Sequence, residues 1–214
     1  MPTPQRGRPS GSSILSRPAV FLNLPYDRKF ESLFLAYVAG VCAFGMTPRT
    51  TLEIPGSQRR LDRILSLIGD CPYSIHDLSR VQLDRKQPAT PRFNMPFELG
   101  LAVAHEKLGG KHAWFVFEEM DERLEKSLSD VKGTDVYIHH GRTSGVFAKL
   151  GNAFLRTVPR PTVPQMTAIY FGLRSSVPRI MRETGADTLF EARPFQELAA
   201  LASGLTSQVV IHER

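Results

Sequence analysis

The residue best placed for chemistry is the carboxylate Glu98, in the run Asn94-Met-Pro-Phe-Glu-Leu-Gly that follows a polar loop. Proline is favoured in the first turn of a helix, so Pro96 predicts a helix that starts there, reaches about Leu108 and places Glu98 near its third position. The helix dipole favours an ionised carboxylate at that point. Two roles stay open: Glu98 caps the helix, or it acts beside a ligand as a nucleophile or stabilises positive charge on a sugar carbon.

Residues that could bind a nucleotide lie in the loops around this helix. Tyr26 and Phe93 could stack on a base, and Arg80 or Arg92 could meet phosphates. Phe93 is equally compatible with a core position, and Arg80 with a solvated one. The loop from residue 76 to residue 94 is longer than most connections, and such loops commonly bind ligands. The stretch from Tyr73 to Leu108 is therefore the predicted ligand site.

The elements that position these residues alternate between strand and helix five times. This alternation predicts an α/β fold with a doubly wound parallel sheet, and our preferred topology is a flavodoxin-like five-stranded sheet in the order 2-1-3-4-5. Such sheets bind ligands beside the carboxyl ends of their strands. Asp27 is a candidate cap for the first helix. The expected strands span about 19–24, 50–54, 73–75, 113–117 and 136–138, and the later helices about 58–68, 96–108, 121–129 and 144–156.

The chain divides into three parts by composition. Residues 1–16 are rich in Pro, Gly, Ser and Arg and predict a flexible leader. Residues 17–158 form the expected α/β domain. Residues 159–214 begin with a Pro-rich segment and predict a mainly helical C-terminal extension, with helices near 165–183 and 194–203, that could serve as a contact surface for a second copy or a partner protein.

Composition narrows the functional class. The content of 42% hydrophobic and 22% charged residues is ordinary for a globular protein, and no apolar run is long enough for a membrane span or a signal peptide, so we expect a cytoplasmic protein with no membrane partner. The net charge of +6 is scattered and comes with no nucleic-acid motif. It therefore suits a small phosphorylated ligand better than nucleic acid.

Several other site types are not supported by spacing. The histidines lack zinc-ligand spacing, so we expect no metal, and the two cysteines are expected to be reduced packing residues. No Gly-rich loop matches a phosphate-cradling motif, which argues against a dinucleotide oxidoreductase or a P-loop enzyme. We expect no cofactor, with NAD or another nucleotide acting as the substrate.

The motif around Glu98 resembles two related families. Phe97-Glu-Leu-Gly-Leu-Ala is similar to the helix that carries the catalytic glutamate of nucleoside 2-deoxyribosyltransferases, and Asn94-Met-Pro-Phe-Glu-Leu-Gly is similar to the glutamate helix of NAD-hydrolysing Toll/interleukin-receptor (TIR) domains. The resemblance implies a flavodoxin-like fold, with Glu98 as the catalytic carboxylate. It also implies that Asp77 orients the sugar and base, and that the loop Asn23-Leu-Pro-Tyr-Asp lines the ligand. The sequence departs from the deoxyribosyltransferases after Asp77, where Leu-Ser replaces the expected glycine. The first loop departs from both families, because it lacks the Gly-Pro-Phe-like run of the deoxyribosyltransferases and the Ser-rich run of TIR domains.

Both families break the bond between a ribose and its base. A cationic nicotinamide leaves without protonation, whereas a neutral purine needs an acid, for which His76 or Asp77 could serve. We expect catalytic roles for Glu98 and Asp77. The expected ligand-binding residues are Asn23, Tyr26, Asp27, His76, Arg80, Arg92, Phe93 and Asn94. The alternatives are a non-catalytic TIR-like nucleotide-sensing or protein-interaction module, in which Glu98 is a cap, and a deoxyribosyltransferase.

Overall fold

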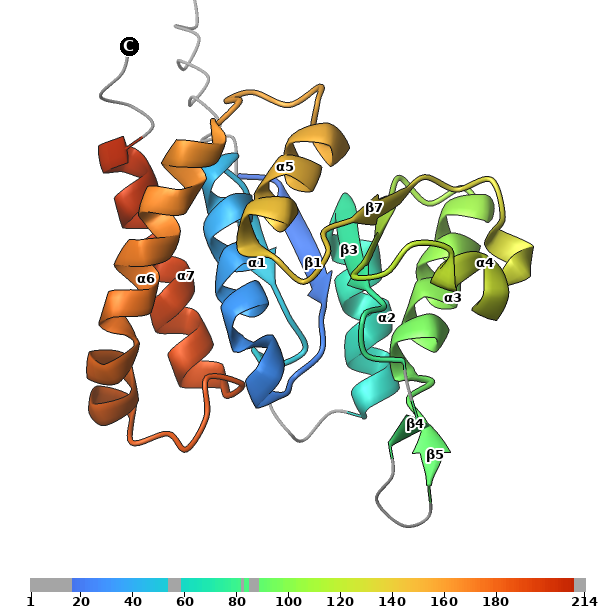
Figure 1. Ribbon diagram of the computed structural model, residues 1–214, viewed down its shortest axis with the longest axis horizontal. Helices are drawn as coiled ribbons and strands as arrows, with labels where there is room; N and C mark the ends of the chain where they lie inside the picture. The colour runs from blue at the N-terminus through green and yellow to red at the C-terminus, as the bar shows by residue number, and fades with distance from the viewer. Residues whose placement is uncertain (1–16, 54–58, 82, 85–88, 210–214) are drawn as a thin grey trace, which may run out of the picture.

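A parallel sheet with helices on both faces forms the body of the protein (Figure 1). The computed structural model describes residues 17–53, 59–81, 83–84 and 89–209, so the expected leader of residues 1–16 lies outside the described residues. The sheet strands are β1 (Ala19–Asn23), β2 (Thr47–Arg49), β3 (Tyr73–Asp77), β6 (Ala113–Glu118) and β7 (Val136–Ile138). The helices are α1 (Glu31–Ala43), α2 (Arg60–Asp70), α3 (Asn94–Lys107), α4 (Arg123–Ser127), α5 (Thr143–Ala153), α6 (Val163–Thr184) and α7 (Ala192–Val209), with short 3-10 turns at Arg28–Phe30 and Ser129–Val131.

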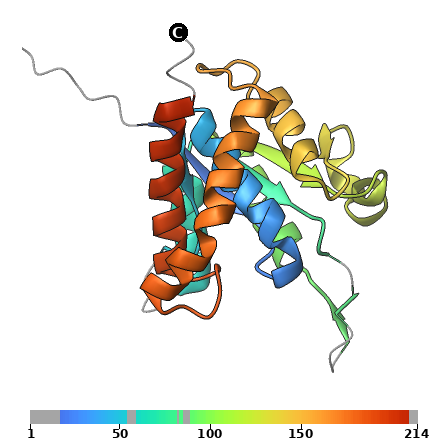
Figure 2. The same ribbon diagram turned by 60° about the vertical axis from the view of Figure 1, so that its left-hand side comes forward.

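The strand order across the sheet is β2-β1-β3-β6-β7, and all neighbouring strands are parallel. Numbered along the chain, this differs from the predicted order 2-1-3-4-5. The difference arises because two short strands, β4 (Leu83–Asp84) and β5 (Thr90–Pro91), lie in the loop between β3 and α3 and pair only with each other. Their hairpin projects away from the body of the molecule below α3 (Figures 1 and 2). The five-stranded parallel sheet is consistent with a flavodoxin-like fold.

Side-chain alternation along each strand builds a separate core on each face of the sheet. Val20, Leu22 and Ile75 point into the larger core, which they share with α1, α5, α6 and α7. Phe21 points the other way, into a smaller core with α2 and α3. The continuous apolar run of residues 113–117 is therefore explained, because β6 is buried on both faces.

The second strand begins three residues before its predicted range of 50–54. Thr47–Arg49 pairs with β1, whereas the chain turns at Thr50. The Glu53 carboxylate accepts a hydrogen bond from Arg49 Nε at 2.6 Å, and the Thr50 hydroxyl accepts one from the backbone N–H of Leu52 at 3.2 Å. These local polar bonds compete with strand pairing and end β2 early. Ile54 lies outside the described residues.

The predicted C-terminal helices are present as α6 and α7, and both pack against α1. Figure 2 shows α6 (orange) and α7 (red) beside α1 (blue). A capping box fixes the start of α6, where the Thr162 hydroxyl accepts from the backbone N–H of Gln165 and the Gln165 side chain accepts from that of Thr162. Ile169, Leu173 and Phe195 are buried in the same core as α1. Within the described part of the chain, no helix has the length and hydropathy needed to cross a membrane.

Candidate functional site

Glu98 lies further into its helix than the sequence predicts. α3 begins at Asn94, because the backbone N–H of Phe97 already donates to the carbonyl of Phe93 at 3.0 Å. A proline at the third position is tolerated because the first four N–H groups of a helix have no partner inside it. Glu98 is therefore the fifth residue of α3 rather than the third, the first turn holds no acidic residue, and the N-cap residue Phe93 makes no side-chain capping hydrogen bond. The capping interpretation of Glu98 is wrong.

Burial gives the Glu98 carboxyl unusual acid–base properties. The residue is only 2% exposed, and this desolvation raises its pKa from 4.5 to about 7, although Arg60 opposes the shift. The guanidinium of Arg60, on the first turn of α2, lies 3.5 Å from the Glu98 Oε1 atom and is half exposed. At neutral pH both protonation states of Glu98 are populated, so it can take up or release a proton.

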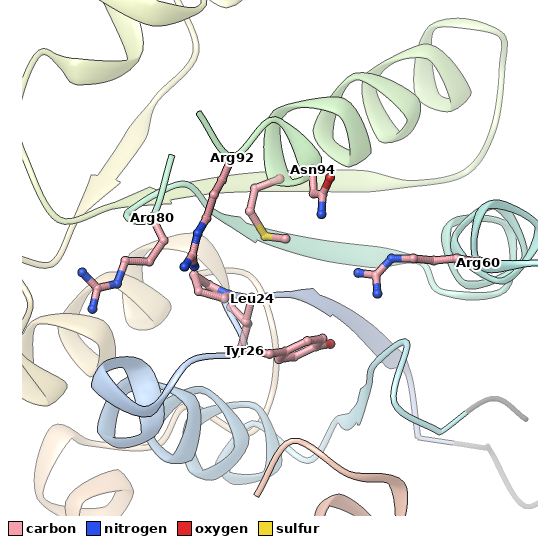
Figure 3. Close-up of a pocket in the computed structure, with 8 residues that line it drawn as sticks. Leu24, Tyr26, Arg60, Arg80, Arg92 and Asn94 are labelled. Carbon is pink, nitrogen blue, oxygen red and sulfur yellow. The ribbon is translucent and has the colours of Figure 1, made fainter. Parts of the chain in front are cut away.

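A cavity of about 400 Å³ opens between the first loop, the start of α2 and the start of α3 (Figure 3). Figure 3 shows Arg60 reaching in from α2 on the side opposite Arg80 and Arg92, with Tyr26 between them. Three arginines line this cavity, although the Arg80 guanidinium points away from the other two in Figure 3, and guanidinium groups suit a phosphate or pyrophosphate group. We call this cavity the cationic chamber; it is lined by Leu24, Pro25, Tyr26, Arg60, Arg80, Arg92, Asn94 and Met95.

A second cavity of about 250 Å³ adjoins the chamber between α2 and α3, and Glu98 lines it. We call it the α2–α3 groove; its lining residues are Arg60, Leu61, Ile64, Asn94, Phe97 and Glu98. Because Arg60 and Asn94 line both cavities, the two form one bipartite site. Cavities for small ligands commonly measure about 300–1,000 Å³. The chamber alone falls within this range, and the groove adds to it.

Tyr26 is held in the chamber by elements that are distant in sequence. Its ring lies 5.6 Å from that of Phe190, in the loop between α6 and α7, and 6.3 Å from that of Phe34 on α1. Its hydroxyl lies 3.3 Å from the Thr51 hydroxyl. Burial raises the pKa of Tyr26 to about 12, so the phenol keeps its proton and can donate a hydrogen bond. The C-terminal extension thus supports a predicted binding residue.

Asp27 acts in this structure as the counter-ion of two arginines. Its Oδ2 atom lies 3.4 Å from Arg80 Nε and 3.4 Å from Arg92 Nη1. The same carboxylate accepts from the backbone N–H of Lys29 at 3.1 Å and so caps the 3-10 turn that leads into α1, rather than α1 itself, whose N-cap is Phe30. Asp27 does not line the chamber. An anionic ligand that binds Arg80 and Arg92 therefore has to share them with Asp27.

Asn23 and His76 are buried beside the site and do not line either cavity. The Asn23 amide donates to His76 Nδ1 at 2.9 Å and to the backbone carbonyl of Met95 at 3.3 Å. Asn23 thereby joins the end of β1 to the first turn of α3. Neither residue faces the two cavities, and Asn23 instead links the end of β1 to the helix that carries Glu98.

A chain of hydrogen bonds fixes the neutral state of His76. The Cys71 carbonyl can only accept, so His112 donates to it from Nδ1 at 2.7 Å and accepts at Nε2 from the Ser74 hydroxyl at 2.7 Å. Ser74 in turn accepts from His76 Nε2 at 2.9 Å. Burial lowers the pKa of His76 to about 3. The predicted role of His76 as an acid for a leaving base is therefore not supported.

Asp77 faces the side of the sheet opposite His76, because neighbouring strand residues point to opposite faces. Its Oδ2 atom accepts from the Tyr37 hydroxyl at 2.7 Å and from His139 Nε2 at 3.1 Å, and its Oδ1 atom accepts from the backbone N–H of Ser79 at 2.9 Å. The carboxylate is fully buried and lines neither cavity. The structure thus does not bring Asp77 together with Glu98, and the predicted catalytic pair is reduced to Glu98.

The remaining predicted residues divide between the site and the surface. Asn94 lines both cavities, and Arg80 and Arg92 line the chamber. Phe93 is 64% exposed, so it is not a core residue, and it lines neither cavity. Three residues that line the groove, Arg60, Leu61 and Phe97, are not among the site residues that the sequence predicts. The basic run around Arg60 was the available signal, but its distance in sequence from Glu98 concealed the pairing.

Comparison with protein-family models, with curated proteins and with solved structures finds no match at the threshold applied. The geometry of the site therefore carries the functional argument. Among residues 17–53, 59–81, 83–84 and 89–209, no group of three metal-ligating side chains could hold a metal ion.

Proposed function

We propose that this protein is a TIR-like or deoxyribosyltransferase-like enzyme that cleaves the ribose–base bond of NAD or a related nucleotide through Glu98. The observation that carries the proposal is a buried carboxylate of pKa about 7 that lines the α2–α3 groove and lies 3.5 Å from Arg60, which also lines the chamber with two other arginines. The chamber suits the phosphates of a nucleotide, and the carboxylate suits the positive charge that develops on the sugar.

The chemistry assigned to Glu98 follows from its two protonation states. When the bond between C1 and the base breaks, its electron pair leaves with the base and C1 becomes oxocarbenium-like. Ionised Glu98 stabilises this charge and then accepts the proton that a water molecule loses as it adds to C1. Arg60, half exposed beside Glu98, favours the ionised form.

Among the described residues, neither predicted acid, His76 nor Asp77, lines the site, and this bears on the substrate class. His76 has a pKa of about 3, and the Asp77 carboxylate is buried on the other face of the sheet. A neutral purine needs protonation to leave, whereas the cationic nicotinamide of NAD takes the electron pair without it. The site therefore favours a nucleotide with a cationic base.

A second candidate is a module that binds a nucleotide without cleaving it. The observation that favours it is the low exposure of the Glu98 side chain, which is 3%. Under this alternative the carboxylate stays paired with Arg60, and the nucleotide contacts only the chamber. Ligand binding without base release would support it.

The experiment is incubation of the protein with NAD, NADP and a panel of nucleosides, followed by mass spectrometry of released bases. We expect release of nicotinamide, abolished by Glu98→Gln. The matched control is Glu106→Gln, which makes the same change on the same helix at a residue that lines neither cavity. A deoxyribosyltransferase would instead turn over faster when a second base is added.

A further inference from the structure

We infer that the α2–α3 groove is the subsite for the base of the nucleotide, recognised by Phe97 and Leu61. This inference rests on the proposed function, because that function places the sugar beside Glu98. The groove and the cationic chamber share Arg60 and Asn94, but only the groove contains Glu98. The location of the carboxylate therefore decides which part of the ligand lies in which cavity.

The geometry of a ribose ring supports this division. The base is attached at C1 and the phosphates at C5, which is bonded to C4, so the two groups leave the sugar ring at its two ends, on either side of the ring oxygen. If C1 is within reach of Glu98, the sugar lies at the junction of the two cavities. The phosphates then extend toward Arg80 and Arg92, and the base extends into the groove.

The walls of the groove suit a flat heteroaromatic ring, whether neutral or cationic. Phe97 on α3 is 56% exposed and Leu61 on α2 is 44% exposed, whereas Ile64 between them is buried. Apolar and aromatic walls favour a ring that can stack, and stacking tolerates different bases because every base has a π face. Asn94 at the junction offers both a donor and an acceptor to the edge of the ring.

Exposed residues of the same type elsewhere make matched controls for this subsite. Leu65 lies one turn after Leu61 on α2 and is 47% exposed, but it lines neither cavity. Phe171 on α6 is 57% exposed and is also outside both cavities. Replacing either by alanine removes a similar exposed side chain without changing the groove.

The test compares two ligand pairs that differ only in the base. Nicotinamide mononucleotide and AMP are each compared with ribose 5-phosphate in calorimetric titrations of the full chain carrying Glu98→Gln, so that no ligand is consumed. Phe97→Ala and Leu61→Ala should weaken binding of both nucleotides about five-fold or more, while ribose 5-phosphate binds as before. Leu65→Ala and Phe171→Ala should leave all three affinities unchanged.

Three results would overturn the inference. In the first, the nucleotides bind no more tightly than ribose 5-phosphate. In the second, the Phe97→Ala and Leu61→Ala proteins bind all three ligands as the parent protein does. In the third, the parent protein is a dimer and both variants are monomers, which would make the groove an interface between copies. Base release by the unmodified chain is measured separately. Its absence, together with base binding that depends on Phe97 and Leu61, would reject the glycosidase and retain the base subsite.

Discussion

At the scale of single residues, the site is organised around the cost of burying the Glu98 carboxyl. Its type and helical context are visible in the sequence, and the fold places it in a cavity as expected. The burial of the Glu98 carboxyl cannot be predicted from the sequence, because it depends on how α2 packs against α3. Asp77 shows the same difficulty: its position at the end of β3 is predictable, but its hydrogen bonds to Tyr37 and His139 depend on the arrangement of three distant segments.

The raised pKa of Glu98 predicts a specific dependence of stability on pH. A carboxyl whose pKa rises from 4.5 to about 7 on folding contributes stability that is full below pH 4.5 and is lost as the pH rises through 7. The glutamine in Glu98→Gln does not ionise. As the pH rises from 4.5 to 7, the melting temperature of the variant should therefore rise relative to that of the parent. A pKa unit corresponds to about 1.4 kcal/mol, so the relative gain is on the order of 3 kcal/mol.

Thermal unfolding of both proteins from pH 4 to pH 8 checks this prediction. The buried histidines are the same in the two proteins, so the loss of stability that their lowered pKa values cause at acid pH cancels in the comparison. Parallel curves over the whole range would contradict the burial of an ionisable Glu98.

At the scale of elements, the ends of β1 and β3 and the start of α3 form one hydrogen-bonded unit. Asn23 joins β1 to α3 through the Met95 carbonyl, and His76 on β3 accepts from the same amide. Strand and helix periodicity predicts these elements well, because it reports which face of each is buried. It does not report the two-residue shift in the start of α3, or the hairpin in the loop between β3 and α3, since both depend on local hydrogen bonds.

Replacing Asn23 by alanine should loosen the start of α3. The change leaves the buried His76 Nδ1 atom and the Met95 carbonyl without this donor, at a cost of about 1–3 kcal/mol for an unsatisfied buried group. Chemical denaturation should show that loss, and amide exchange should increase at residues 97–99. Asn94→Ala, at an exposed position of the same helix start, is the control. Equal exchange in the Asn23→Ala and parent proteins would show that Asn23 does not position this helix.

At the scale of the whole molecule, the C-terminal extension belongs to the core that supports the site. The sequence indicates its helices from their apolar spacing, but not their docking, because an apolar face does not identify its partner. α6 and α7 cover α1, and Phe190 between them contacts Tyr26 in the chamber. The free energy of unfolding of a protein is only about 5–15 kcal/mol, so the free-energy cost of exposing this face of α1 should exceed it.

Deletion of residues 159–214 should therefore abolish cooperative unfolding rather than release a stable α/β domain. Circular dichroism and thermal melting of the truncated chain, compared with the full chain, measure this. The truncated protein exposes buried residues of α1 such as Phe34, which packs at 6.1 Å from Phe195 of α7. A sharp transition near the melting temperature of the full chain would show that the extension is dispensable for folding.

The most direct test of the central claim is the release of nicotinamide from NAD, followed over time by mass spectrometry. Because Glu98 is the proposed carboxylate at C1, the unmodified chain and Glu106→Gln should release nicotinamide at similar rates. Glu98→Gln should release none while still binding NAD. If Glu98→Gln releases nicotinamide at the rate of the unmodified chain, Glu98 is not the group that acts on the glycosidic bond, and the proposed function is wrong.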